Sequence, residues 1–105
     1  MSDGDLHAPH LLDVELLSSI RRLTLTGAIS DDRAADARLD FAELAILRYP
    51  HDVLADRAWE LRANLTAYDA VFVALAEALD APLVTCDARL SRAAGVRARV
   101  ELFAP

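Results

Sequence analysis

Three acidic residues, Glu15, Asp69 and Asp87, are the candidates for catalysis or metal binding in this sequence. Their carboxylate oxygens are hard ligands, which suit Mg²⁺ or Mn²⁺. Several carboxylates at one place repel one another unless a cation neutralises them. If the three meet in the fold, they form a divalent metal site that can activate water and neutralise charge developing on a phosphodiester.

Each of the three also has an ordinary structural explanation. Glu15 could lie at the edge of an amphipathic helix and reach water. Asp69 is the third residue after Thr66, the position from which an acidic side chain returns to a helix cap. Asp87 follows the apolar run 83–86 and could cap the helical turn after it. The residue types alone leave both interpretations open.

The composition restricts the remaining classes of protein. A chain of 105 residues, 54% hydrophobic and 27% charged, is typical of one globular domain. Its one cysteine, Cys86, cannot form an intramolecular disulfide or a zinc site. No uncharged run approaches the roughly 20 residues of a membrane-spanning helix, so we expect a cytoplasmic protein that does not enter membranes. The net charge of -6 opposes binding to nucleic acid through phosphates alone, unless a metal supplies positive charge.

Helical and strand patterns alternate along the chain. Pro9 suits the first position of a helix over 10–26, and Gly27 suits the end of that helix. Ser30 and Thr66 have side chains that cap helices, and acidic residues follow both. The expected elements are a strand at 5–8, helices at 10–26 and 30–44, a strand at 45–49, helices at 53–65 and 66–80, a strand at 83–86, a helical turn at 88–93 and a strand at 96–102.

This alternation predicts an α/β fold in which helices cover both faces of a parallel sheet. Ligands bind at the carboxyl ends of the strands in such sheets. Asp87 directly follows the strand expected at 83–86 and is therefore expected at the site. Trp59 and Phe72 are expected in the core because of their size and apolarity.

Three segments resemble motifs of a known family. They are Pro9–Glu15, Thr66–Glu77 and Leu83–Leu90, with the sequences PHLLDVE, TAYDAVFVALAE and LVTCDARL. Together they resemble the later motifs of PIN-domain proteins, and within that family they look most like VapC toxins. The resemblance covers essentially the whole chain in the family's order. It implies a single domain, 1–105, with a three-layer α/β/α architecture around a short parallel sheet.

The resemblance also marks one departure from the family. PIN-domain proteins normally open with a hydrophobic strand that ends in an aspartate, the first acidic metal ligand. This chain is expected to lack that N-terminal strand. Asp3 and Asp5 do not replace its aspartate, because no apolar run precedes them.

The resemblance implies an activity and its partners. VapC toxins are endoribonucleases that use Mg²⁺ or Mn²⁺, cut tRNA, rRNA or mRNA, form homodimers and pair with a VapB antitoxin. Glu15, Asp69 and Asp87 fall on acidic positions of the family, which implies that they bind the metal and that one orients the attacking water. Thr85 matches a hydroxyl position that can bond a carboxylate. Arginines that could receive RNA phosphates or an acidic antitoxin segment follow: Arg89, Arg92, Arg97 and Arg99.

Other interpretations stay open from the sequence. A shortened PIN-like protein with weak or no catalysis would bind the antitoxin or a full-length toxin. Asp87 as a phosphoacceptor of the receiver or phosphatase type is disfavoured, because those folds need a lysine and the chain has none. A dimerisation module would explain the leucine and alanine content but not the three placed acids.

Overall fold

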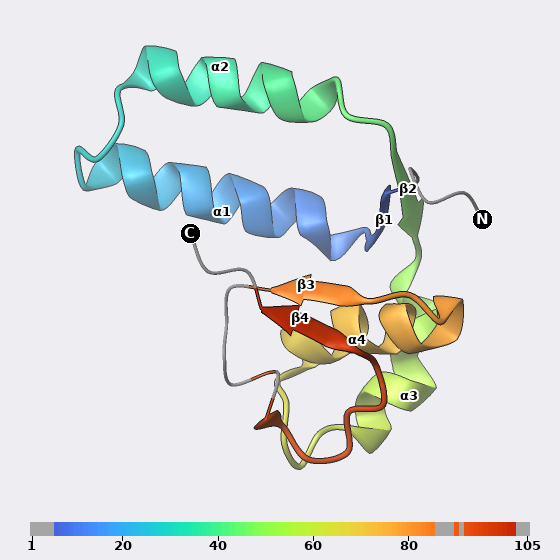
Figure 1. Ribbon diagram of the computed structural model, residues 1–105. Helices are drawn as coiled ribbons and strands as arrows, with labels where there is room; N and C mark the ends of the chain where they lie inside the picture. Colours follow the sequence, from blue (N-terminus) through green and yellow to red (C-terminus); the bar gives the residue numbers. More distant parts are fainter. Residues whose placement is uncertain (1–5, 86–89, 91, 103–105) are drawn as a thin grey trace. The chain divides into compact units, whose positions relative to one another are not determined.

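The computed structural model describes residues 6–85, 90 and 92–102 (Figure 1). The chain forms two compact units, Met1–Tyr49 and Pro50–Pro105. Each unit contains one pair of parallel strands. No helix within the described ranges has the length and apolarity that crossing a membrane requires.

The first unit is a helical hairpin attached to two short strands. Its elements are β1 (Leu6–Pro9), α1 (Leu11–Leu25), α2 (Asp31–Ala42) and β2 (Ile46–Tyr49). Strands β1 and β2 pair in parallel, with Leu6 opposite Ile46. Gly27 has a φ of +77° in the turn after α1, and the Ser30 hydroxyl accepts the N–H of Arg33 at 3.1 Å. Both predicted helix boundaries are therefore confirmed.

The sequence pattern predicted that Pro9 is the first residue of the first helix, and this prediction is wrong. Pro9 is the last residue of β1, where it is buried and pairs with Tyr49. The next N–H, that of His10, donates to the Tyr49 carbonyl at 3.0 Å and continues the strand pairing by one residue. This pairing holds the chain in the sheet, so α1 begins only at Leu11.

Polar contacts join the strands of the first unit to each other and to α1. The guanidinium of Arg48 donates to both carboxylate oxygens of Asp13, at 2.6 and 2.9 Å. The His7 Nδ1 lies 2.7 Å from the Tyr49 hydroxyl. These contacts fix β2 against α1 and β1, although Leu17 and Leu39 remain 49% and 64% exposed.

The second unit packs helices against the other strand pair. It begins with the 3₁₀ turn His51–Leu54 and continues with α3 (Ala55–Glu60), α4 (Ala67–Leu79), β3 (Leu83–Thr85) and β4 (Val100–Leu102). Leu83 lies opposite Val100 in the parallel pair. The core consists of Ala58, Leu61, Ala70, Val73 and Leu90. Small residues in α3 and α4 let the two helices approach closely, which buries Ala70 and Val73 completely.

Two predicted elements are shorter in the structure than in the sequence pattern. The helix expected at 53–65 is a 3₁₀ turn followed by α3, which ends at Glu60. The strand expected at 96–102 begins only at Val100. The N–H of Arg97 donates to the Glu77 side chain instead of to a strand, which keeps this stretch out of the sheet.

The parallel α/β character predicted from the sequence is confirmed by both strand pairs. Trp59 is not in the core, because its side chain is 67% exposed. Phe72 is half-buried on α4. The single domain over 1–105 stays a prediction.

Candidate active site

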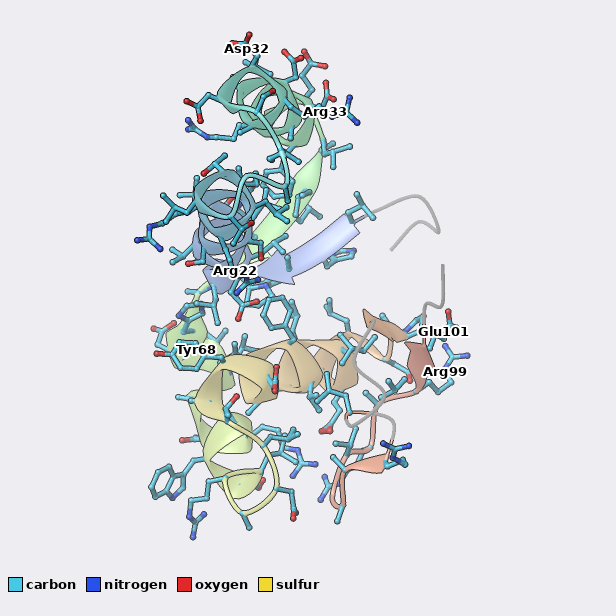
Figure 2. The ribbon with its side chains drawn as sticks, turned by 90° about the vertical axis from the view of Figure 1, so that its left-hand side faces the viewer. Arg22, Asp32, Arg33, Tyr68, Arg99 and Glu101 are labelled. Carbon is cyan, nitrogen blue, oxygen red and sulfur yellow. The ribbon has the colours of Figure 1, made fainter. Side chains whose placement is uncertain are left out.

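Asp69 lies in the first turn of α4 and directly follows Tyr68 in the sequence. Tyr68 is exposed on this turn (Figure 2). The helix begins there because Thr66 has an extended backbone and its hydroxyl accepts the N–H of Asp69 at 3.2 Å. Only this half of the predicted capping box is present. Among the described residues, the Asp69 carboxylate makes no return bond to the Thr66 N–H. The Asp69 carboxylate is half-buried, and no hydrogen bond or ion pair joins it to another described residue.

Glu15 is half-buried on α1 of the first unit. Leu11 and Leu12, one turn before it, are also half-buried. Glu15 therefore shares a partly buried stretch of α1 with apolar residues. A partly covered carboxylate on such a face is compatible with ligand binding and with a helix edge that reaches water.

Asp87 and Arg89 lie outside the described residues. Thr85 ends β3, so the chain enters the segment with Asp87 from the carboxyl end of a parallel strand. Arg92, Arg97 and Arg99 are exposed in the second unit. The predicted parallel strand before Asp87 is therefore confirmed over Leu83–Thr85, and the position of Asp87 itself stays a prediction.

The predicted metal site requires at least three carboxylate or other ligand side chains at one place. Among residues 6–85, 90 and 92–102, no three His, Cys, Asp or Glu side chains gather in a group that could hold a metal ion. Asp87, one member of the predicted set, is outside these residues. The donor chemistry fits, since Glu15 and Asp69 offer carboxylate oxygens and that of Asp69 has no described competitor. Convergence of the three acids stays a prediction.

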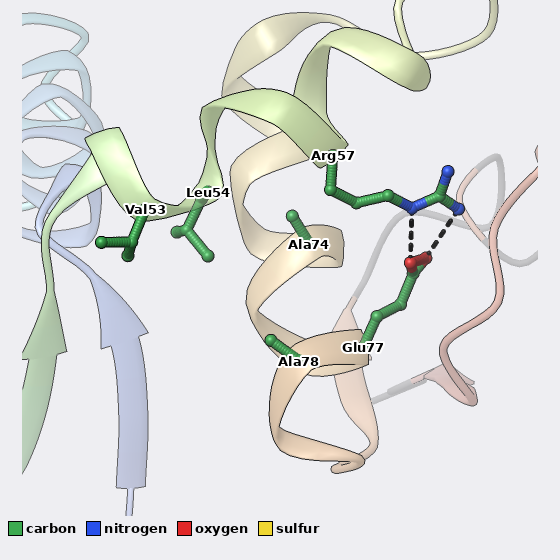
Figure 3. A pocket seen from close by; sticks show the side chains of 6 residues that line it. All are labelled: Val53, Leu54, Arg57, Ala74, Glu77 and Ala78. Carbon is green, nitrogen blue, oxygen red and sulfur yellow. Dashed lines mark hydrogen bonds and ion pairs between the residues drawn. The ribbon is translucent and has the colours of Figure 1, made fainter.

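A further charged group, Glu77 on α4, was not predicted from the sequence. Its carboxylate accepts from Arg57 Nε at 2.6 Å and from Arg57 Nη2 at 3.2 Å (Figure 3). It also accepts the backbone N–H of Arg97 at 3.0 Å, while Arg57 donates to the Gly95 carbonyl at 2.7 Å. Glu77 and Arg57 therefore tie the segment before β4 to α3 and α4.

The surroundings of Glu77 shift its protonation. Burial raises the pKa of Glu77, but hydrogen bonds from Arg57 and Arg97 and the charge of Arg57 outweigh burial, so that the pKa lies below its usual value. The pair borders a pocket of about 280 Å³ whose other lining is apolar: Val53, Leu54, Ala74 and Ala78. With both carboxylate oxygens engaged, Glu77 acts as a structural group. The sequence held no signal for it, because its partners are 20 residues away in both directions.

Comparison with known proteins gives the chain its family. The PIN domain matches residues 1–96, a span that includes all three candidate acids. Ribonuclease VapC9 of Mycobacterium tuberculosis is 50% identical over 86 residues, which cover 82% of this chain and 68% of that protein. Ribonuclease VapC1 of the same organism is 45% identical over 97 residues, covering 91% and 73%. Ribonuclease VapC12 is 39% identical over 99 residues, covering 94% and 77%. With these matches over most of its length, the chain belongs to the PIN-domain family and is of the VapC type.

Proposed function

We propose that this protein is an endoribonuclease toxin of a toxin–antitoxin pair, which hydrolyses RNA phosphodiester bonds with Mg²⁺ or Mn²⁺. The observation that carries the proposal is the similarity to several proteins named ribonuclease VapC over 82% or more of the chain. The half-buried Asp69 carboxylate in the first turn of α4 supports the same chemistry.

In this proposal Glu15, Asp69 and Asp87 hold the divalent cation. When bound, the cation supplies positive charge that offsets the phosphate and lowers the pKa of water. One of the three carboxylates accepts the proton of the attacking water. Thr85 matches a hydroxyl position of the family and would bond a carboxylate or a metal-bound water. The exposed guanidinium groups of Arg92, Arg97 and Arg99 bind RNA phosphates on either side of the cut.

The proposed partners follow from the same relatives. A VapB-type antitoxin would bind and silence the toxin, and the substrate would be tRNA, rRNA or mRNA. We also propose a homodimer, because exposed leucines on both helices of the first unit are available for burial against another chain. They include Leu17, Leu23 and Leu39.

The test is cleavage of total bacterial RNA with mapping of the fragment ends. The purified protein is expected to cut in Mg²⁺ or Mn²⁺ and to stop cutting in EDTA. Attack by water leaves a terminal phosphate and a free hydroxyl, whereas attack by the ribose 2′-hydroxyl leaves a cyclic phosphate. The end chemistry therefore separates this activity from a contaminating metal-independent ribonuclease.

Three carboxylate variants assign the activity to the site. Glu15→Gln, Asp69→Asn and Asp87→Asn are each expected to lower the cleavage rate by about 100-fold or more. Asp36→Asn, an exposed acid on α2, is the matched control and is expected to cut at the normal rate. Normal cleavage by Asp69→Asn would contradict the proposal. Antitoxin binding without any cleavage would identify the chain as an inactive binder instead.

A further inference from the structure

Trp59 is a large aromatic side chain that the fold of the second unit leaves unburied. It lies in the last turn of α3 and is 67% exposed, although it is the only tryptophan in the chain. Tryptophan has the largest apolar surface of any side chain, so a ligand that stacks on the ring can bury a large area. The core of this unit is formed by Ala58 and Leu61 on either side of it, with no contribution from the indole.

Arg62 holds the exposed ring in place. Its guanidinium carbon lies 4.5 Å from the centre of the Trp59 ring, within the range of a cation–π contact. Its Nη1 also donates to the Trp59 carbonyl at 3.0 Å. Within the described part of the chain, Arg62 forms no ion pair with a carboxylate. The guanidinium covers one part of the indole and keeps its own positive charge available at the surface.

The pair lies where α3 turns into α4. Residues 61–66 connect the two packed helices, so the last turn of α3 and the first turn of α4 belong to the same end of this helical pair. Tyr68, which is 64% exposed, occupies that first turn of α4 (Figure 2). Asp69 follows it in the same turn. Trp59 and Arg62 therefore lie at the same end of the helical pair as Tyr68 and Asp69.

We propose that Trp59 and Arg62 form a platform on which an unpaired base of the RNA substrate stacks, with Arg62 binding an adjacent phosphate. This inference rests on the proposed ribonuclease function and adds a substrate-binding site to it. Single-stranded RNA is bound by base stacking on aromatic side chains and by arginine. The platform would select unpaired RNA, because a base stacked inside a double helix cannot expose its face to the indole.

Charge favours RNA over a second protein copy as the occupant. The positive charge at this place comes from Arg62, whose guanidinium lies over the indole and forms no ion pair within the described residues. Arg62 thus offers a cation beside an aromatic face, which complements an anionic chain of bases. A ring held by a guanidinium also loses little freedom when a base stacks on it.

The fluorescence of Trp59 reports on this contact directly. We would titrate the full protein with a ten-nucleotide oligoadenylate in EDTA, where no cleavage occurs. Stacking is expected to quench the indole emission. Anisotropy of the labelled oligoadenylate is expected to show about tenfold weaker binding to Trp59→Ala and to Arg62→Ala, and near-normal binding to Trp59→Phe. Arg33→Ala, an exposed arginine on α2, is the matched control and should bind normally.

The outcomes separate the platform from the ribonuclease function. Cleavage of RNA in Mg²⁺ without quenching, and with unchanged binding to Trp59→Ala, would overturn the platform alone. Quenching without cleavage would support the platform as an RNA-binding site and contradict the enzymatic function. Emission that changes with protein concentration in the absence of RNA, together with a monomeric Trp59→Ala, would overturn the platform in favour of an interface between copies.

Discussion

At the scale of single residues, Glu77 shows how one side chain holds together segments that are distant in sequence. It is 12% exposed and accepts from Arg57 and from the Arg97 backbone. Replacing it with alanine would leave the guanidinium of Arg57, itself 21% exposed, without its main partner. We expect Glu77→Ala to lower the free energy of unfolding by about 2 kcal/mol, measured by urea denaturation. An unchanged denaturation midpoint would show that the ion pair contributes little.

The same residue predicts a pH dependence of stability. Because the pKa of folded Glu77 lies below its usual 4.5, the folded state holds the proton less tightly than the unfolded state does. The contribution of the pair is therefore complete above about pH 4.5 and is lost as the pH falls through the folded-state pKa. Between pH 5 and 3 the free energy of unfolding of Glu77→Gln should fall less steeply than that of the wild-type protein. The difference between the two proteins should be about the same in low and in high salt. Parallel curves for the two proteins would contradict this assignment.

Asp69 and Glu77 differ in what the sequence can reveal. The cap of α4 depends on residues three apart, so the Thr66 hydroxyl and the Asp69 N–H could be paired from the sequence alone. That pairing does not decide whether the Asp69 carboxylate also returns to the cap. The described structure shows that it does not. Contacts over 20 residues, such as Arg57 with Glu77, follow from packing and leave no local pattern.

At the scale of elements, helix boundaries follow from caps that the structure confirms. Thr66 caps α4, and Ser30 caps α2 in the same way. Thr66→Ala and Ser30→Ala should each lower stability by about 1 kcal/mol, whereas Thr66→Ser should be nearly neutral. Hydrogen exchange should locate the loss in the first turn of the affected helix. An equal loss in Thr66→Ser would point to the methyl group instead of the hydroxyl bond.

The end of α4 offers a stabilising change. Asp80 ends this helix with a φ of +49°, a conformation that costs energy for any residue with a Cβ, and it places a negative charge at the negative end of the helix dipole. Asp80→Gly is expected to raise the free energy of unfolding by about 0.5–1 kcal/mol, read from the urea midpoint. Asp80→Ala removes the charge but keeps the strained backbone and should gain less. A lower midpoint for the glycine variant would mean that the Asp80 side chain stabilises the turn.

Elements that depend on long-range pairing were the ones predicted with wrong boundaries. Pro9 satisfies the rule for a first helical residue, but pairing of β1 with β2 takes precedence. The stretch before β4 alternates like a strand, but its backbone forms hydrogen bonds with the side chains of Arg57 and Glu77 instead of with a neighbouring strand. Trp59 was expected inside because of its type, whereas alanines and Leu61 fill that space.

At the scale of the whole molecule, three acids that are distant in sequence are expected to serve one cation. The net charge of -6 opposes RNA binding through phosphates alone, and a cation held by these acids would offset that repulsion at the site of cleavage. Local patterns identified Glu15, Asp69 and Asp87 one by one. The resemblance to PIN-domain proteins implied that the three bind the same metal ion. Their convergence depends on the complete fold, which no local pattern encodes.

The most direct test is calorimetric titration of the protein with Mn²⁺. The wild-type chain and the Asp36→Asn control are expected to bind the cation equally well. Glu15→Gln and Asp69→Asn are each expected to weaken binding by about tenfold or more, because each removes a carboxylate from the same site. Affinity for Mn²⁺ that is unchanged in both variants would contradict the shared metal site and the mechanism built on it.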